Sequence, residues 1–315
     1  MKTFCIKVVL FLTILVGFLI SLEVILSWHI SSRASFRLES QPNMVVFGDS
    51  YPQCSFNDSI IHHFSNLSYS ADFYYFIFHK FKYVIDQNPE IVTVFIGVSR
   101  YQVIEDLDDW LWEDKYLTRR QGYPLYAPLM GVDDKLKLLF KNPSGWLQAN
   151  SISLKENLKR ILKQDYDFID EIGSYRYHHD HENFTNLELL DSDKKNACDV
   201  LIKENLLYLD QMLTLCKAKN KQAYFVRTPI NPDYTYCDHR IEELLSSNYP
   251  EIEVLDFRHI LTSDHHFRDL EHLNSSGADL FSFFFQQLIE DGLLDQEDKQ
   301  AFIERQFLRF FPSNL

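Results

Sequence analysis

The sequence predicts an α/β domain with a parallel sheet, preceded by one transmembrane helix. From residue 44 onward, short apolar, β-branched runs alternate with longer segments whose apolar residues repeat at helical spacing, the pattern of βαβ units. The runs are apolar almost throughout, as expected for strands covered on both faces. A separate apolar segment, 4–28, opens the chain and as a helix would match a hydrocarbon core of about 30 Å.

Four runs are typical of strands and each stops near a turn signal. They occupy residues 44–47, 91–96, 223–226 and 252–257, with a weaker strand near 66–70. The first ends at Gly48, the second at Gly97 and the third before Thr228-Pro229. In an open parallel sheet, ligands gather at the carboxyl ends of the strands, so we expect a site after residues 47 and 97.

Helices are predicted between the strands at 73–86 and 198–219, and after the last strand at 276–288. The first stops before Asn88-Pro89, where proline disfavours a continued helix. We expect residues 1–30 to be an anchor, 31–43 a linker and 44–315 the domain, with an insertion at about 101–192. The insertion's tryptophans could bind a sugar chain or lie near the membrane, but we interpret them as the insertion's own small core. The insertion is also the best candidate for the part that selects an acceptor.

The N-terminal segment is predicted to remain as an anchor. Its apolar part is longer than the roughly 7–15 residues of a cleavable signal peptide and runs to Trp28, a residue type common at membrane interfaces. Lys2 and Lys7 favour a cytoplasmic N-terminus. The rest of this single-pass protein would then lie outside the cytoplasm, with the periplasm as the favoured compartment.

Composition predicts a large globular domain and excludes one class of partner. Hydrophobic residues make up 46% and aromatic residues 15% of the chain, and the net charge is −14. Nucleic-acid binding needs a basic surface, so it is excluded, and we expect no binding of anionic membranes by the body of the domain. No cofactor is predicted, and no metal, because the run 178–182 (His-His-Asp-His-Glu) matches no zinc motif.

The five cysteines form no CxxC pair and are too few for a disulfide scaffold. One disulfide among Cys54, Cys198, Cys216 and Cys237 is left open, since Cys5 falls in the anchor. Cys54 is predicted to be buried in the helix that follows Ser50.

Two short motifs far apart supply the groups of one active site. Gly48-Asp49-Ser50 ends the first strand, and Asp269-Leu270-Glu271-His272 lies near the end of the chain. A serine hydroxyl is a poor nucleophile unless an imidazole takes its proton and a carboxylate orients that imidazole. Ser50, His272 and Asp269 are therefore the predicted catalytic residues.

Alternatives remain at each position. Asp49-Ser50 could simply cap the next helix, and His272 and Asp269 could be surface and loop residues. Asp256 could replace the orienting carboxylate, and His265 or His266 the base.

The motifs resemble the first and last sequence blocks of the SGNH/GDSL hydrolase superfamily. The resemblance rests on Phe47-Gly48-Asp49-Ser50 and on residues 269–274 with Gly277 following, and it covers 44–288 without most of the insertion. It implies a three-layer α/β/α fold with a five-stranded, flavodoxin-like parallel sheet. It also implies that Ser50 is the nucleophile, His272 the general base and acid, and Asp269 the orienting carboxylate.

The oxyanion hole is where the chain departs from that family. The backbone N–H of Ser50 would supply one donor, but the family's glycine after the second strand and Gly-x-Asn after the third are replaced by 66–70 and by Gly97-Val98-Ser99-Arg100. Ser70 or Ser68 could supply a backbone donor, and Ser99 or Arg100 a side-chain donor.

The anchored layout resembles the membrane-associated branch that modifies cell-envelope polymers, which includes alginate acetylation proteins and the D-alanyl transfer protein of teichoic acid synthesis. This resemblance implies an acyl ester or polysaccharide substrate, acyl transfer from Ser50 to a polysaccharide hydroxyl, and a membrane-bound acyl-donor partner. The alternative is a catalytically inactive, anchored binding or assembly protein that keeps the fold, which the missing Gly-x-Asn favours.

Overall fold

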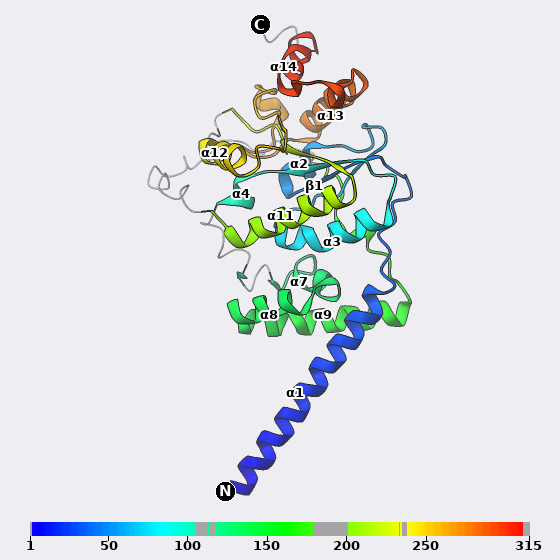
Figure 1. Cartoon of the computed structure of the whole chain (residues 1–315), viewed down its shortest axis with the longest axis vertical. Coiled ribbons are helices and arrows are strands. Elements are labelled where there is room, and N and C mark those ends of the chain that lie inside the picture. Colours follow the sequence, from blue (N-terminus) through cyan, green and yellow to red (C-terminus); the bar gives the residue numbers. More distant parts are fainter. Residues whose placement is uncertain are drawn as a thin grey trace. The chain divides into compact units, whose positions relative to one another are not determined.

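A five-stranded, all-parallel sheet forms the core of the α/β part of the chain (Figure 1). The computed structural model describes residues 2–104, 112–113, 117–178, 201–232, 234 and 238–310. The strand order is β2-β1-β3-β4-β5, which is the flavodoxin-like order, so the predicted fold class is confirmed. The strands are β1 (Met44–Phe47), β2 (Phe64–Asn66), β3 (Thr93–Gly97), β4 (Gln222–Arg227) and β5 (Val254–Asp256).

Four strands overlap the predicted runs, but the weak one lies earlier than expected. β2 pairs with β1 through Met44 opposite Phe64 and Val46 opposite Asn66, so the prediction of 66–70 was wrong in its bounds. The Asn66 side chain explains where β2 ends. Its amide donates to the carbonyl of Pro52 at 2.8 Å and its oxygen accepts the backbone N–H of Ser68 at 3.0 Å, which turns the chain out of the sheet.

The predicted helices at 73–86 and 276–288 are confirmed as α3 and α13. The helix predicted at 198–219 is confirmed as α11, which begins later, at Lys203. The helices around the sheet are α2 (Ser50–Ser55), α3 (Tyr74–Gln87), α4 (Arg100–Val103), α10 (Ile169–Ile172), α11 (Lys203–Ala218), α12 (Asp238–Asn248), α13 (Ser275–Glu290) and α14 (Lys299–Phe310), with 3-10 turns η5 (Asp264–His266) and η6 (Leu293–Asp295).

Helices cover both faces of the sheet because successive strand residues point to opposite sides. On one face, Val46 and Phe95 share a buried cluster with Phe285 of α13. On the other face, Phe47 contacts Phe81 of α3, with ring centroids 4.9 Å apart. This alternation explains why the central strands β1 and β3 are largely apolar on both faces, and it produces three layers.

The chain separates into two compact units. One consists of residues 1–35 and 110–168, and the other, of residues 36–109 and 169–315, contains the sheet. The first unit contains α1 (Lys2–Ser31), α7 (Tyr123–Tyr126), η2 (Ala127–Leu129), α8 (Val132–Lys141) and α9 (Pro143–Lys163). The predicted insertion contributes to both units, and its residues 105–111, 114–116 and 179–192 lie outside the described residues.

One helix near the N-terminus is long and apolar enough to cross a membrane. Its apolar part covers Thr3–Ser31, 29 residues, and contains the predicted segment 4–28.

Candidate active site

Ser50 lies where β1 passes into α2, at the carboxyl end of the strand. Asp49 is the N-cap of α2, and its Oδ1 accepts the backbone N–H of Tyr51 at 3.0 Å. The residue before Asp49 must be a glycine, because a Cβ on Gly48 would lie 2.4 Å from Cγ of Pro52. The Gly-Asp-Ser motif is therefore a tight strand-to-helix turn that begins α2 with the predicted nucleophile.

The structure brings the three predicted catalytic residues together. The Oγ of Ser50 lies 2.8 Å from Nε2 of His272. The other ring nitrogen, Nδ1, lies 2.9 and 3.0 Å from the two carboxylate oxygens of Asp269. Hydroxyl, imidazole and carboxylate therefore form one hydrogen-bonded chain in the order required for general-base activation of a serine.

A short turn fixes the carboxylate and the imidazole relative to each other. Oδ1 of Asp269 accepts the backbone N–H groups of Glu271 at 2.9 Å and His272 at 2.8 Å, as aspartate commonly does in turns. Asn274 then caps α13 by accepting the N–H of Gly277 at 2.9 Å. The motif from Asp269 to Gly277 thus encodes a turn and a helix start that together hold the base.

The charges around His272 favour its protonated form. Burial opposes the imidazolium, but the hydrogen bond and charge of Asp269, with the charges of Glu271 and Asp49, outweigh it and raise the pKa of His272. Burial likewise opposes the Asp269 carboxylate, and the hydrogen bond and charge of His272 lower its pKa overall. The pair is therefore suited to hold a proton taken from Ser50.

Glu271, next to His272 in the chain, accepts hydrogen bonds from three tyrosines on three segments. Its carboxylate receives the hydroxyls of Tyr51 in α2 at 3.1 Å, Tyr101 in α4 at 2.8 Å and Tyr234 after β4 at 2.5 Å. Burial and the charge of Glu271 raise the pKa of all three phenols, so they remain donors. This cluster ties the turn that bears the base to the ends of β1, β3 and β4.

The role of Glu271 and its three tyrosine partners was not predicted from the sequence. Glu271 falls inside a quoted motif and Tyr51 follows the nucleophile, but spacing along the chain carries no signal that three separate segments converge on one carboxylate. Only the fold brings them together.

The predicted oxyanion donors after β3 already have partners. The hydroxyl of Ser99 donates to Oδ2 of Asp49, and burial raises the pKa of that carboxyl although Ser99 and Tyr51 oppose the shift. The guanidinium of Arg100 lies 4.8 Å from the centre of the Tyr101 ring. Ser99 thus supports the residue that caps the helix bearing Ser50.

The candidates after β2 are engaged in different ways, Ser70 through its side chain and Ser68 through its backbone N–H. The Ser70 hydroxyl donates to Oε1 of Gln53 at 2.6 Å and accepts from Nη1 of Arg176 at 3.1 Å. The backbone N–H of Ser68 donates to Oδ1 of Asn66 at 3.0 Å, which removes Ser68 as a free backbone donor. The oxyanion assignment to Ser50, Ser70, Ser99 and Arg100 stays a prediction.

The structure does not place the alternative residues in the triad. Oδ1 of Asp256 accepts from Nε of Arg258 at 3.0 Å, and this pairing lowers the pKa of Asp256 although burial opposes it. His265 and His266 lie in η5, whereas the ring that contacts Oγ of Ser50 is that of His272.

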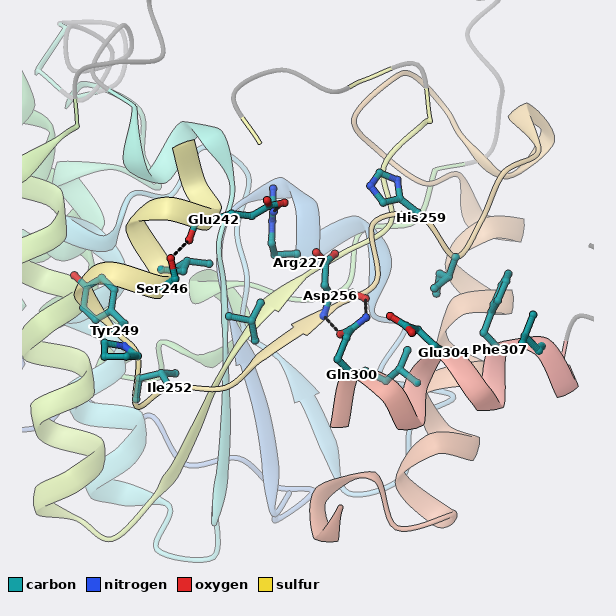
Figure 2. Close-up of a pocket in the computed structure, with 16 residues that line it drawn as sticks. Arg227, Glu242, Ser246, Tyr249, Ile252, Asp256, His259, Gln300, Glu304 and Phe307 are labelled. Carbon is teal, nitrogen blue, oxygen red and sulfur yellow. Dashed lines mark hydrogen bonds and ion pairs between the residues drawn. The ribbon is translucent and has the colours of Figure 1, made fainter. Parts of the chain in front are cut away.

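A groove of about 740 Å³ runs along β5 between α12 and α14 (Figure 2). Apolar side chains such as Ile252 and Phe307 line much of it. Gln300 of α14 bridges the exposed side of β5, accepting the backbone N–H of Asp256 at 3.0 Å and donating to its carbonyl at 3.1 Å. The described residues that line the groove include none of the triad.

Among the described residues, no group of three or more His, Cys, Asp or Glu side chains could hold a metal ion. Of the run 178–182, only His178 is described. Cys54 is buried in α2 as predicted, and burial raises the pKa of its thiol to about 12, so it is an unreactive neighbour of Ser50. Cys198 and Cys237 lie outside the described residues.

No protein-family model matches this chain, and no curated protein matches its sequence significantly. Function is therefore inferred from the geometry of the site.

Proposed function

We propose that this chain is a serine-dependent SGNH-type enzyme that hydrolyses acyl esters or transfers acyl groups, acetyl being the simplest, on a cell-envelope or extracellular polysaccharide. The observation that carries the proposal is the 2.8 Å separation between Oγ of Ser50 and Nε2 of His272, with Asp269 on the other ring nitrogen. The sequence resemblance to SGNH/GDSL hydrolases and the flavodoxin-like strand order support the same assignment.

In the first half-reaction, Oγ of Ser50 attacks the acyl carbonyl while Nε2 of His272 takes its proton. Asp269 stabilises the resulting imidazolium, and the backbone N–H of Ser50 is a candidate donor to the oxyanion. The bond to the leaving oxygen then breaks, and that oxygen takes the proton from His272. The products are an acyl ester on Ser50 and a free alcohol.

In the second half-reaction, a hydroxyl replaces the departed alcohol. His272 removes its proton, the oxygen attacks the acyl-Ser50 carbonyl, and Ser50 leaves with the proton that His272 returns. Water as acceptor gives hydrolysis, and a polysaccharide hydroxyl gives transfer.

The cellular setting follows from α1. We infer that α1 is an anchor with its N-terminus in the cytoplasm, so that the catalytic domain lies outside the cytoplasm, in the periplasm. Its apolar length supports this placement. A membrane-bound acyl donor would then supply the activated acyl group.

The test is to treat the full chain in detergent with a fluorophosphonate probe and with an activated acetyl ester. Both require a nucleophilic serine, so we expect labelling and ester turnover in the wild type and loss of both in Ser50→Ala and His272→Ala. Ser246→Ala is the matched control, because Ser246 is an exposed serine whose hydroxyl donates to the carbonyls of Glu242 and Glu243 in its own helix.

The second candidate is a catalytically inactive binding or assembly protein. The absence of Gly-x-Asn after β3, the engaged hydroxyl of Ser99 and the engaged backbone N–H of Ser68 favour it. A folded wild type that reacts with neither reagent would support this candidate and contradict the enzyme.

A further inference from the structure

The longest helix of the first unit after α1 has an exposed apolar face. At 100° per residue, the buried positions of α9 lie on one side and the exposed leucines on the other. The buried side includes Ala149 and Ser153. The opposite side includes Leu147, Leu158 and Leu162, which are 60%, 43% and 84% exposed.

The neighbouring helix α8 repeats the pattern. Val132, Leu136 and Phe140 follow one another at four-residue spacing and are 65%, 40% and 79% exposed, whereas Leu138 is fully buried. Together the two helices expose six large apolar side chains, more than scattered single residues on a water-facing surface.

The same unit contains α1, which fixes where a membrane would lie. The first turns of α1 are exposed and apolar, whereas Leu26 and Ile30 near its end are buried. Nζ of Lys135 in α8 lies 2.6 Å from Glu23 and 3.0 Å from Ser27. α8 therefore contacts α1 about twenty residues after α1 begins. The apolar stretch before this contact is long enough to cross a hydrocarbon core.

The chain just after α9 also contacts the C-terminal end of α1. Nε2 of His29 lies 3.0 Å from the hydroxyl of Tyr166, shortly after α9 ends. Figure 1 shows α9 crossing the C-terminal end of α1 rather than following its length, with α8 next to α9. Trp28, on the exposed side of this end, is 69% exposed and is typical of a membrane interface.

The charge of these helices also differs from that of the chain. Residues 132–163 carry seven basic and three acidic side chains, a net charge of +4, whereas the whole chain carries −14. An amphipathic segment with basic residues is the kind that lies in a headgroup region rich in anionic lipid. The expectation that the body of the domain avoids anionic membranes therefore does not extend to this segment.

We propose that the exposed apolar faces of α8 and α9 lie in the interface of the bilayer that α1 crosses, with acyl chains and anionic lipid headgroups as their partner. This proposal rests on the membrane anchor of the proposed function. Seating two helices on the surface in addition to α1 would restrict the tilt of the first unit, which a single spanning helix cannot do alone.

The experiment measures depth by spin labels on the full chain in phospholipid vesicles. Single cysteines replace Phe140, Leu162, Phe11 in α1, and Ser246 in α12, in a background without native cysteines whose circular dichroism matches the wild type. We expect the labels at 140 and 162 to be relaxed by oxygen and shielded from a water-soluble nickel reagent. The label at 11 should behave the same way and the label at 246 the opposite way.

The label at 11 separates the two claims. If the label at 11 is in lipid while the labels at 140 and 162 are exposed to water like the label at 246, α8 and α9 do not lie in the interface. The proposal that α1 spans the membrane would still hold. If the label at 11 is itself in water, the anchor fails and this inference fails with it. Vesicles of phosphatidylcholine with and without phosphatidylglycerol test the charge, since shielding at 140 and 162 should increase with the anionic lipid. Equal shielding in both would overturn the anionic-lipid part.

Discussion

Two regions at the carboxyl side of the sheet hold buried charge, but only one has the parts of an active site. At the end of β1, a hydroxyl, an imidazole and a carboxylate form a chain from Ser50 to Asp269. At the ends of β4 and β5, Arg227 and Arg258 are surrounded by Asp238, Glu242 and Asp256. The second region borders the groove along β5 (Figure 2).

Cavity size and buried charge therefore do not by themselves identify a catalytic site. In the arginine region, each cation meets a carboxylate and the described residues of the cluster offer no nucleophile beside a base, so the charges neutralise one another. In the triad, the three groups differ in proton affinity, and the hydroxyl of Ser50 lies next to a base, His272, that can activate it. Substitutions in the two regions should therefore have different effects.

The largest effect is expected at the triad. Ser50→Ala or His272→Ala should lower kcat/KM for an activated ester by a factor on the order of 10⁴ or more, because each removes a member of a group that acts as a unit. Thermal unfolding should change little. Ester hydrolysis and a melting curve on the same samples check this, and a large loss of stability with retained turnover would reverse the comparison.

The arginine region should show the opposite pattern. Arg258→Met leaves Asp256 and Asp238 without a cation they contact at 2.5 and 2.8 Å. We expect a loss of about 2 to 3 kcal/mol in unfolding free energy, below the 3–5 expected for a fully buried pair because the carboxylates are partly exposed. Denaturant unfolding measures the loss. Turnover per folded molecule should stay at the wild-type value, and its collapse would place a catalytic role in this region.

A smaller effect is expected at the edge of the sheet. Gln300→Leu removes two hydrogen bonds to the backbone of Asp256 and should cost about 1 to 2 kcal/mol of stability. It should leave ester turnover unchanged. Denaturant unfolding and activity on one preparation test both halves, and an unchanged midpoint would show that the bridge contributes nothing.

The smallest expected effect is a shift in the pH dependence of kcat/KM, which reports the pKa of His272. His272 must be neutral to accept a proton, so kcat/KM should rise with pH through a pKa above the ordinary histidine value of about 6.5. Glu271→Gln removes a negative charge that favours the imidazolium, so the inflection should move to lower pH.

The matched control for that shift is Glu304→Gln, which removes a carboxylate from the groove along β5. The other groups that act on His272 are Asp269, Asp49 and His178, and both variants keep them. An inflection that stays in place in Glu271→Gln, or that moves equally in Glu304→Gln, would contradict the role assigned to Glu271.

Sequence patterns predicted the sheet and the three triad residues because both depend on local signals. A strand buried on both faces must be apolar, and a nucleophile turn needs Gly48 to clear Pro52, so each leaves a mark in consecutive residues. The cluster of three tyrosines on Glu271 forms from segments that are far apart in the chain, so consecutive residues carry no sign of it. The early end of β2 depends on where the Asn66 side chain bonds, which composition cannot show.

The most direct test that Ser50 is the nucleophile is the mass of the peptide containing Ser50 during turnover. The full chain is mixed with an activated acetyl ester, quenched in acid within the first turnovers and digested, and the peptide containing Ser50 is analysed by mass spectrometry. We expect one acetyl group on Ser50 in the wild type and none in His272→Ala. An enzyme that turns over the ester with Ser50 unmodified, and keeps its activity in Ser50→Ala, would contradict this expectation.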